Sequence, residues 1–180
     1  MISTSPNIWK FSWQTLLAWT AAYAIWEPIS YFVIPKIFKA STTQEYYTHS
    51  KFPFSIVAFG DYIYSTFLLL VSQQVITNFA GTAAPQSWSA WLARFAGFVG
   101  VQWAGDLTFW QIIQRVPLKN KYVDFFQRYG KDVGIGAPIG DSLYGLVWFL
   151  TTQIVAGNIP TWLQVTLITL FMFGTLVVSY

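Results

Sequence analysis

Four acidic residues stand inside long apolar stretches of the sequence, where a charged group is costly. They are Glu27, Asp61, Asp106 and Asp141, and each of the three aspartates directly follows a glycine. A charged side chain near the centre of a membrane helix costs about 2.5–3.5 kcal/mol on insertion scales. Such residues are kept where they face the interior of a bundle, hold a proton or accept hydrogen bonds. Any chemistry in this chain therefore has to involve these four carboxyl groups.

The composition favours lipid as the surroundings of the chain. Of the 180 residues, 54% are hydrophobic and only 9% are charged, against about 25% charged in an average soluble domain. Aromatic residues reach 20%, which is more apolar surface than a soluble core of this size would hold. The chain has no cysteine, and this excludes disulfides and cysteine-ligated metal sites. The net charge of +3 comes from two loops, so we expect no nucleic-acid binding.

Five segments are long enough to cross a bilayer, which takes about 20 residues each. The sequence therefore predicts an all-α integral membrane protein, a single domain over residues 1–180 built as a five-helix transmembrane bundle. Glu27 precedes Pro28 inside the first segment, so a kink or a lost hydrogen bond is expected there. The five segments cover approximately residues 11–35, 54–79, 88–115, 138–157 and 160–180. The third has a face of small residues suited to close helix packing: Ala93, Ala96, Gly97, Gly100 and Ala104.

The basic residues predict the orientation of the chain in the membrane. Only Lys10 and Arg94 fall on one side of the expected bundle. Cytoplasmic loops are enriched in lysine and arginine, so we expect the N-terminus outside and the C-terminus on the cytoplasmic side. The other eight basic residues lie in the loops after the first and third segments: Lys36, Lys39, Lys51, Arg115, Lys119, Lys121, Arg128 and Lys131.

The longer basic loop, KNKYVDFFQRYGK, predicts a short amphipathic helix. Such a helix is typical of an anchor in the lipid headgroup region, and the alternative is a docking surface for a partner protein at residues 116–137. The aromatic residues recur at i, i+3, i+4 and i+7: Tyr122, Phe125, Phe126 and Tyr129. The basic side chains that would contact headgroups or a partner are Arg115, Lys119, Lys121, Arg128 and Lys131.

Two stretches, GDYIYSTFLLLVSQQVITN from Gly60 and GDSLYGLVWFLTTQIVAGN from Gly140, align without a gap and are identical at seven of nineteen positions. Spans two–three and four–five therefore look like two parallel copies of one helical hairpin. Only residues 157–160 join the last two spans, so we expect these to pack tightly against each other. The identical polar pairs are Asp61 with Asp141, Tyr64 with Tyr144, Gln73 with Gln153 and Asn78 with Asn158.

The four intramembrane acids fall at one depth of the expected bundle. Spans two and four start on the cytoplasmic side and carry Asp61 and Asp141 early, whereas spans one and three end there and carry Glu27 and Asp106 late. At 1.5 Å of rise per residue, all four lie within roughly 15 Å of the cytoplasmic helix ends. The sequence therefore predicts an acidic cluster, with Tyr64, Tyr144, Gln73 and Gln153 as supporting polar residues.

Three interpretations of this acidic cluster are open. In the structural one, which we favour, the aspartates accept bonds from backbone N–H groups, tyrosine or tryptophan, or pair with a loop cation such as Arg115. The helix dipole would also favour Asp61 and Asp141 near helix starts. The chain is then a structural or assembly component of a membrane. The second interpretation is a proton or small-cation pathway, in which clustered carboxylates share protons or a cation. The third is an enzyme.

The residue types offer little support for an enzyme. His49 is the only histidine, which excludes multi-histidine metal sites, and neither HExxH nor GxSxG occurs. The segment PIGD at residues 138–141 resembles the end of the GxGD motif of intramembrane aspartyl proteases. However, proline replaces its first glycine, and no Tyr-Asp pair supplies the partner. We therefore expect no catalytic site, no metal and no cofactor.

The stretch from Val116 to Gly145, VPLKNKYVDFFQRYGKDVGIGAPIGDSLYG, resembles a pattern in uncharacterised multi-pass membrane proteins encoded by giant DNA viruses. There, a Val-Pro, an aromatic and basic loop and a Gly-Asp-Ser precede an apolar helix. The resemblance covers about a sixth of the chain and implies a viral or virus-modified membrane, such as a host membrane or a virion inner membrane. It implies a structural or assembly role and carries no catalytic residues. The sequence is also compatible with a homo-oligomer.

Overall fold

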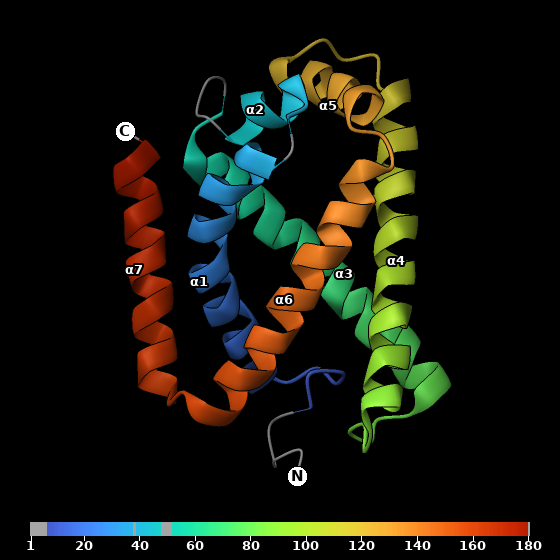
Figure 1. Ribbon diagram of the computed structural model, residues 1–180, viewed down its shortest axis with the longest axis vertical. Coiled ribbons are helices and arrows are strands. Elements are labelled where there is room, and N and C mark those ends of the chain that lie inside the picture. Colours follow the sequence, from blue (N-terminus) through green and yellow to red (C-terminus); the bar gives the residue numbers. More distant parts are fainter. Residues whose placement is uncertain (1–6, 38, 48–51, 180) are drawn as a thin grey trace.

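The computed structural model describes residues 7–37, 39–47 and 52–179, whose regular elements are all helices (Figure 1). The expected spans match the long helices to within about two residues at each end, so the all-α prediction is confirmed. His49 and Lys51 lie outside the described residues. The long helices are α1 (Trp13–Ile37), α3 (Phe54–Ala80), α4 (Trp88–Arg115), α6 (Gly136–Asn158) and α7 (Thr161–Ser179), and the short ones are α2 (Ser41–Tyr47) and α5 (Lys121–Asp132).

Two of the long helices, α3 and α7, are long and apolar enough to cross a bilayer by themselves. Helices α5 and α6 meet at a bend of 94° and form a third candidate span if they are taken together. A soluble protein rarely exposes a large contiguous apolar surface, so the outside of these helices agrees with an integral membrane protein. Examples of large apolar side chains that are between 64% and 89% exposed are Phe32, Ile63, Phe79, Leu170 and Phe173.

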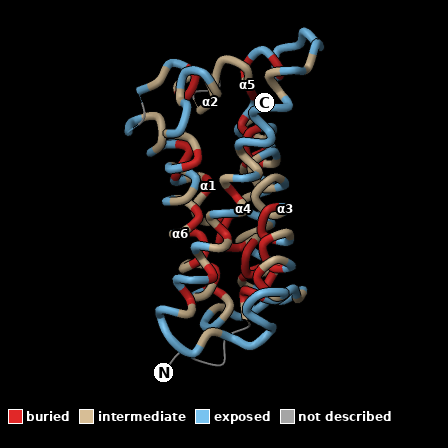
Figure 2. The backbone as a smooth tube through the Cα atoms, turned by 90° about the vertical axis from the view of Figure 1, so that its right-hand side faces the viewer, coloured by how far each residue is buried: buried red, intermediate tan, exposed pale blue. Residues whose placement is uncertain are grey.

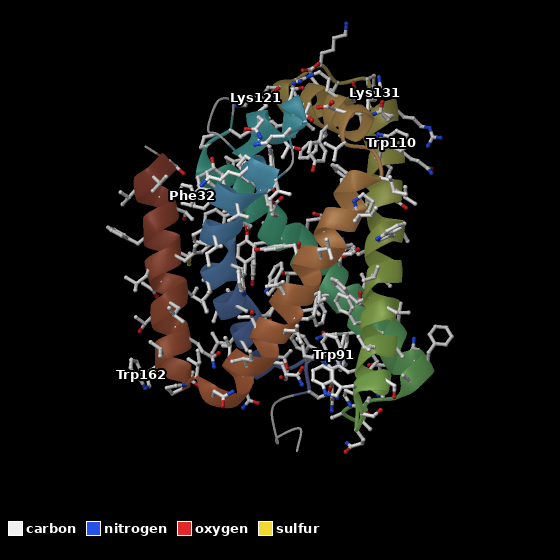
Figure 3. All side chains as sticks on the ribbon, viewed as in Figure 1. Phe32, Trp91, Trp110, Lys121, Lys131 and Trp162 are labelled. Carbon is white, nitrogen blue, oxygen red and sulfur yellow. The ribbon has the colours of Figure 1, made fainter. Side chains whose placement is uncertain are left out.

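The long helices alternate in direction between the two ends of the molecule (Figure 1). Helices α2 and α5 lie together across one end, where α7 finishes, and α1 starts at the other end. Lys121 and Lys131 mark the end that carries α2 and α5, whereas Trp91 and Trp162 lie near the opposite end (Figure 3). The basic loop residues that the structure describes therefore lie toward one end, as the charge pattern predicts.

Helix α1 is central to the bundle and packs against both α6 and α7. Ala18, Ala21 and Ala22 on α1 are completely buried, and small side chains of this kind let neighbouring helices approach closely. Next to them the indole rings of Trp19 and Trp148 stack with their centroids 3.8 Å apart. Figure 2 shows that the buried residues concentrate in the middle of the molecule, where these contacts lie.

Helices α6 and α7 do not pack as the tight hairpin that their short connection predicts. They meet at residues 159–160, but each packs mainly on α1 (Figure 1). Helices α3 and α4, by contrast, do pack against each other. The physical reason is the small-residue face of α1, which offers both helices a closer contact than they offer each other. The small residues of α4 are not such a face, because four of them are exposed: Ala93, Ala96, Gly100 and Ala104.

The proline in the first span does not interrupt its helix. Helix α1 continues through Pro28 to Ile37. One turn along, Ser30 Oγ donates to the carbonyls of Trp26 at 2.9 Å and Glu27 at 3.1 Å. Pro28 has no N–H to donate, so one backbone hydrogen bond is missing there, as predicted. The helix nevertheless continues past it.

Arg94 on α4 is one of the two basic residues on the charge-poor side, and its side chain caps the end of α3. Its side chain is buried, and its guanidinium donates to the carbonyl oxygens of Ala83 at 2.6 Å and Ala80 at 3.2 Å. Ala80 is the last residue of α3. The positive charge therefore satisfies carbonyl groups that the end of a helix leaves without partners.

Tryptophan N–H groups join neighbouring helices by hydrogen bonds. Each ring reaches an acceptor on a different helix, so the bundle is linked through its interior. In membrane proteins such bonds contribute about 0.6 kcal/mol each on average and up to about 1.7 kcal/mol. The donor–acceptor pairs are Trp148 Nε1 to Trp19 O (2.9 Å), Trp91 Nε1 to Gln153 Oε1 (3.0 Å), Trp103 Nε1 to Ser142 Oγ (2.9 Å), Trp19 Nε1 to Thr66 Oγ1 (3.1 Å) and Trp26 Nε1 to Thr151 Oγ1 (2.5 Å).

The substitution Trp148→Phe should lower the melting temperature of the protein in detergent. It removes the donor to the Trp19 carbonyl and leaves a gap beside the stacked ring, at a site that is 2% exposed. Losing one buried hydrogen bond costs about 1–3 kcal/mol. The control is Trp162→Phe, because the Trp162 side chain is 68% exposed. Equal melting temperatures for the two variants would contradict the role given to Trp148.

Candidate functional site: an acidic cluster beneath a two-helix cap

Helix α5 forms as an amphipathic helix, as predicted, but its aromatic side faces protein. Asn120 Oδ1 caps its start by accepting the backbone N–H groups of Tyr122 and Val123, both at 3.0 Å. Phe125 is fully buried and stacks on Tyr46 of α2 with centroids 5.2 Å apart. This side therefore packs on α2 and the start of α3, and the placement of α5 in the headgroup region stays a prediction.

Charged and polar contacts fix α2 on α5, and we call these two helices the cap. Arg128 donates from both terminal nitrogens to the two oxygens of Glu45, at 3.0 and 2.9 Å. Asp132 Oδ2 accepts the backbone N–H and the Oγ1–H of Thr42, at 3.0 and 2.7 Å, and also the hydroxyl of Ser41 at 3.2 Å. A carboxylate from α5 thus serves as the N-terminal cap of α2.

The cap contacts shift the proton affinities of the groups that make them. Hydrogen bonds from Thr42 and Ser41, together with the nearby charge of Arg128, lower the pKa of Asp132 below its ordinary value. The hydrogen bonds to Glu45 and Asp124 raise the pKa of Arg128. Both groups therefore keep their charges throughout the neutral pH range, and the cap is a charged clamp at that pH.

The sequence did not predict α2. Its seven residues, Ser41–Tyr47, are too few for a periodic pattern of apolar positions to be visible. The groups that stabilise it, Arg128 and Asp132, lie 83 to 91 positions further along the chain. The only signal within the segment is the pair of serine and threonine residues at its start, which favours a helix N-terminus.

Glu27 and Asp61 lie beneath the cap and each accept a tyrosine hydroxyl. Glu27 is 3% exposed, and its Oε2 accepts Tyr144 Oη at 3.2 Å. Asp61 is half-buried, and its Oδ1 accepts Tyr46 Oη of the cap at 3.0 Å. Each bond joins two helices, α6 to α1 and α2 to α3. Tyr46 therefore connects the cap directly to the acid cluster.

Asp106 and Asp141 differ in their partners. Asp106 is half-buried, and its Oδ1 accepts Tyr64 Oη from α3 at 2.7 Å, which is a short bond between helices. Asp141 is exposed, and no hydrogen bond from another described residue reaches it. It interacts with the negative charges of Asp106 and Asp61. Asp141 is thus the least satisfied acid of the four.

The structure brings the four acids into one electrostatic neighbourhood. Asp61 interacts with Glu27 as well as with Asp141. Above them, burial together with the charges of Asp141, Asp61 and Asp106 raises the pKa of Tyr129 on α5 above its ordinary value. Within the described residues, no three acidic or histidine side chains are placed to hold a single metal ion.

Two parts of the structural interpretation of the acids are wrong. Neither Asp61 nor Asp141 lies in the first turn of its helix, because α3 begins at Phe54 and α6 at Gly136. The helix dipole therefore does not explain them. Among the described residues, the ion pairs involve Arg128 and the cap acids, and none reaches the four intramembrane acids. Arg115 is exposed and does not pair with them.

The other residues singled out in the sequence lie away from the cluster. Gln73 Nε2 donates to the Ile8 carbonyl at 2.8 Å, and Gln153 accepts Trp91, so both serve contacts nearer the opposite end. Lys119 and Lys131 are exposed, and the Lys121 ammonium lies 5.1 Å from the centroid of the Tyr122 ring. The sequence missed Tyr46 and placed Tyr129 only in the amphipathic helix, because nothing in a loop sequence shows that it folds back over a helix end.

These features define the class of the protein. It is an all-helical protein with two or three candidate membrane spans and an acidic interior that a two-helix cap covers. Comparison of the chain with protein-family models, with curated protein sequences and with solved structures gives no match. The functional argument therefore depends on the residues themselves.

The Gly-Asp pair at 105–106 has a packing reason, which yields a test. A Cβ at Gly105 would lie 2.7 Å from Leu68 Cδ2 and 3.2 Å from Tyr64 Oη, whereas a Cβ at Gly60 would meet no atom within 4 Å. Gly105→Ala should therefore displace Tyr64 from Asp106 and lower the melting temperature. Gly60→Ala should raise it slightly, since alanine favours a helix by about 1 kcal/mol over glycine. A neutral or stabilising Gly105→Ala would contradict this packing.

The cap should loosen in acid. The pKa of Asp132 is lower in the folded protein than its ordinary value of about 3.9, so its stabilising effect is present above that pH and is lost as the pH falls below it. Hydrogen exchange of the α2 amides, corrected for intrinsic rates, should accelerate below about pH 4. At neutral pH, Asp132→Asn should show the same acceleration and Asp124→Asn should not. Unchanged α2 protection in Asp132→Asn would refute the capping role.

Proposed function

We propose that this chain is a multi-pass membrane protein with five transmembrane helices, N-terminus outside and C-terminus on the cytoplasmic side. The alternation of the five long helices and the basic residues at the cap end support this topology. Of the described helices, α3 and α7 alone are candidate spans by themselves, but several polar side chains of α1, α4 and α6 bond to neighbouring helices, which lowers the cost of burying them in lipid. The aligned stretches that contain Asp61 and Asp141 would then be parallel copies of one hairpin, although their packing has diverged.

We propose further that the protein serves as a structural or assembly component of its membrane. The observation that carries this proposal is the pairing of three intramembrane carboxylates with tyrosines from other helices. Each of these three acids then links two helices. The pairs are Tyr144 with Glu27, Tyr64 with Asp106 and Tyr46 with Asp61.

Tyr64 and Tyr144 occupy the same position of the two aligned stretches, four residues after the glycine. Each donates to an acid on a helix that runs the opposite way, Asp106 on α4 and Glu27 on α1. This shared use of one tyrosine supports the proposal of an internal repeat. It also explains why the tyrosine is among the few polar residues that the two stretches share.

The resemblance of residues 116–145 to proteins of giant DNA viruses favours a viral or virus-modified membrane as the location.

A protein partner would meet the cap at the start of α5, where a hollow of about 490 Å³ opens. Two lysines on its rim favour an acidic partner surface. The hollow is lined by Leu118, Lys119, Asn120, Lys121, Asp124 and Gln127.

A proton or small-cation pathway is the second candidate function. Asp141 favours it, because this acid is exposed, lacks a hydrogen-bond donor among the described residues and faces two other carboxylates. Clustered carboxylates of this kind exchange protons or bind cations in transport proteins. The two functions differ in whether protons cross the membrane.

Purified protein in sealed liposomes distinguishes the two functions. A structural component should leave an imposed pH gradient as stable as it is in empty liposomes. Dissipation of the gradient by the wild type, together with its loss in Asp141→Asn, would replace the structural proposal with the pathway.

The topology can be tested with single cysteines, because the chain has none of its own. Cysteines at Lys119 and Ala84 lie in the loops at opposite ends of the bundle, and both side chains are exposed. In right-side-out vesicles, a membrane-impermeant thiol reagent should label Ala84→Cys directly and Lys119→Cys only after permeabilisation. The reverse pattern would invert the proposed orientation, and labelling of both before permeabilisation would contradict the five-span arrangement.

The linking role of the tyrosines should be visible as stability. The double variant Tyr64→Phe with Tyr144→Phe removes two hydrogen bonds and leaves both acids without these donors. At about 1 kcal/mol for each bond, the melting temperature in detergent should fall by roughly 4–8 °C. Tyr122→Phe is the matched control, since this ring lies at the exposed edge of α5. A double variant as stable as the control would remove the support for a structural role.

A further inference from the structure

The carboxyl group of Glu27 lacks a hydrogen-bond donor on one side. Its Oε2 accepts Tyr144, but its Oε1 is buried and has no partner among the described residues. Buried polar atoms in native proteins are almost always hydrogen-bonded, so an unpaired carboxylate oxygen at a site that is 3% exposed needs an explanation. The missing component is a donor, because a carboxylate oxygen can only accept.

Two hydroxyl groups stand beside this carboxyl, but each has its proton committed elsewhere. Tyr23 and Ser30 lie within hydrogen-bonding reach of Glu27. Tyr23 Oη donates to the Ala58 carbonyl at 2.5 Å, and Ser30 Oγ donates to the Trp26 carbonyl at 2.9 Å. A hydroxyl has a single proton and two acceptor lone pairs. Each of the two oxygens thus has a carbonyl acceptor for its own proton and keeps a lone pair that can accept a hydrogen bond from Glu27.

The remaining neighbours supply no positive charge. Helix α7, which also packs on α1, has no titratable residue between Thr161 and Ser179. Of the described charged groups, the one that interacts with Glu27 most directly is another acid, Asp61. The one basic side chain on these elements, Lys36, is exposed and lies nine residues beyond Glu27 on α1. The other titratable side chains on the surrounding elements are Tyr23 and Tyr31 on α1, Asp141 and Tyr144 on α6, Asp61, Tyr62 and Tyr64 on α3, and Glu45, Tyr46 and Tyr47 on α2.

We propose that Glu27 is a proton-binding site, with an exchangeable proton on Oε1 that is donated to Tyr23 Oη or Ser30 Oγ. One proton then supplies the missing donor, uses an acceptor that is free, and removes the repulsion between Glu27 and Asp61. Tyr144 continues to donate to Oε2. Every hydrogen-bonding group around the carboxyl is satisfied in this state, and the buried group carries no uncompensated charge.

The site is placed where proton release affects the packing of the bundle. Tyr144 ties Glu27 to α6, and Tyr23 ties the same turn of α1 to the Ala58 carbonyl of α3. Loss of the proton would leave two like charges next to each other inside the contact between α1 and its neighbours. The inference does not require the structural function proposed above. In a proton pathway, Glu27 would be the residue that holds the proton.

The substitution Glu27→Gln tests the proposal, because glutamine has the shape of a protonated glutamate. Its amide nitrogen donates where the O–H group would, and its oxygen still accepts Tyr144. The melting temperature of the wild type in detergent should fall as the pH is raised from about 5 to 9, whereas that of Glu27→Gln should change by less than half as much and match the wild type in acid. Glu45→Gln, which breaks the ion pair with Arg128, should melt lower than the wild type and keep the pH dependence.

The opposite result would overturn the proposal: Glu27→Gln melts lower than the wild type at every pH and retains the full pH dependence. Infrared difference spectra of the wild type provide a second measurement that needs no stable Glu27 variant. A carboxylic-acid C=O band should disappear as the pH is raised, and it should shift to higher frequency in Tyr144→Phe, which loses one hydrogen bond to this group. Absence of such a band in the wild type at acidic pH, or a band that Tyr144→Phe leaves unchanged, would also refute a proton on Glu27.

Discussion

A polar side chain inside this bundle needs a hydrogen-bond partner within the chain wherever lipid surrounds it, because the hydrocarbon of a bilayer offers no water in its place. Tyrosine and tryptophan meet that need over the longest reach, since each combines a large apolar ring with a single donor at its tip. Trp148 extends from α6 to the backbone of α1, and Tyr64 extends from α3 to Asp106 on α4. The high aromatic content is therefore more than lipid-facing bulk. A good part of it forms the hydrogen-bonded links between helices.

The acids fit the same constraint from the acceptor side. A carboxylate accepts a hydroxyl more strongly than a neutral oxygen does, which makes it an effective partner for a tyrosine that crosses between helices. The cost is that a carboxylate in the acidic cluster is poorly solvated and has no cation beside it among the described residues. The cap lies over this cluster. Tyr46 takes part in both functions, since it stacks on Phe125 within the cap and donates to Asp61 beneath it. Tyr46 thus connects the cap to the acid cluster through a ring contact and a hydrogen bond.

The sequence predicted the helices well and their neighbours poorly. Apolar runs indicate where a helix begins and ends, because length and hydropathy are local properties. The i, i+3, i+4 and i+7 spacing of Tyr122, Phe125, Phe126 and Tyr129 was enough to find α5. Which helix packs on which depends on the fit of side chains far apart in sequence. The buried alanines of α1, such as Ala21, give no stronger signal than the exposed alanines of α4, such as Ala96. Similarly, the acids were predicted at one depth by counting residues, with Tyr64 and Tyr144 as supporting polar residues, but which tyrosine bonds to which acid could not be identified without the fold.

The central claim is that tyrosine–carboxylate bonds between helices stabilise this bundle, and a double-mutant cycle on Tyr64 and Asp106 tests it most directly. Unfolding free energies in detergent would be measured for the parent, Tyr64→Phe, Asp106→Leu and the double variant. The account predicts a favourable coupling energy between the two side chains of about 0.6–1.7 kcal/mol. Strictly additive effects, with a coupling energy of zero within error, would show that the 2.7 Å bond contributes nothing to stability and would contradict the account.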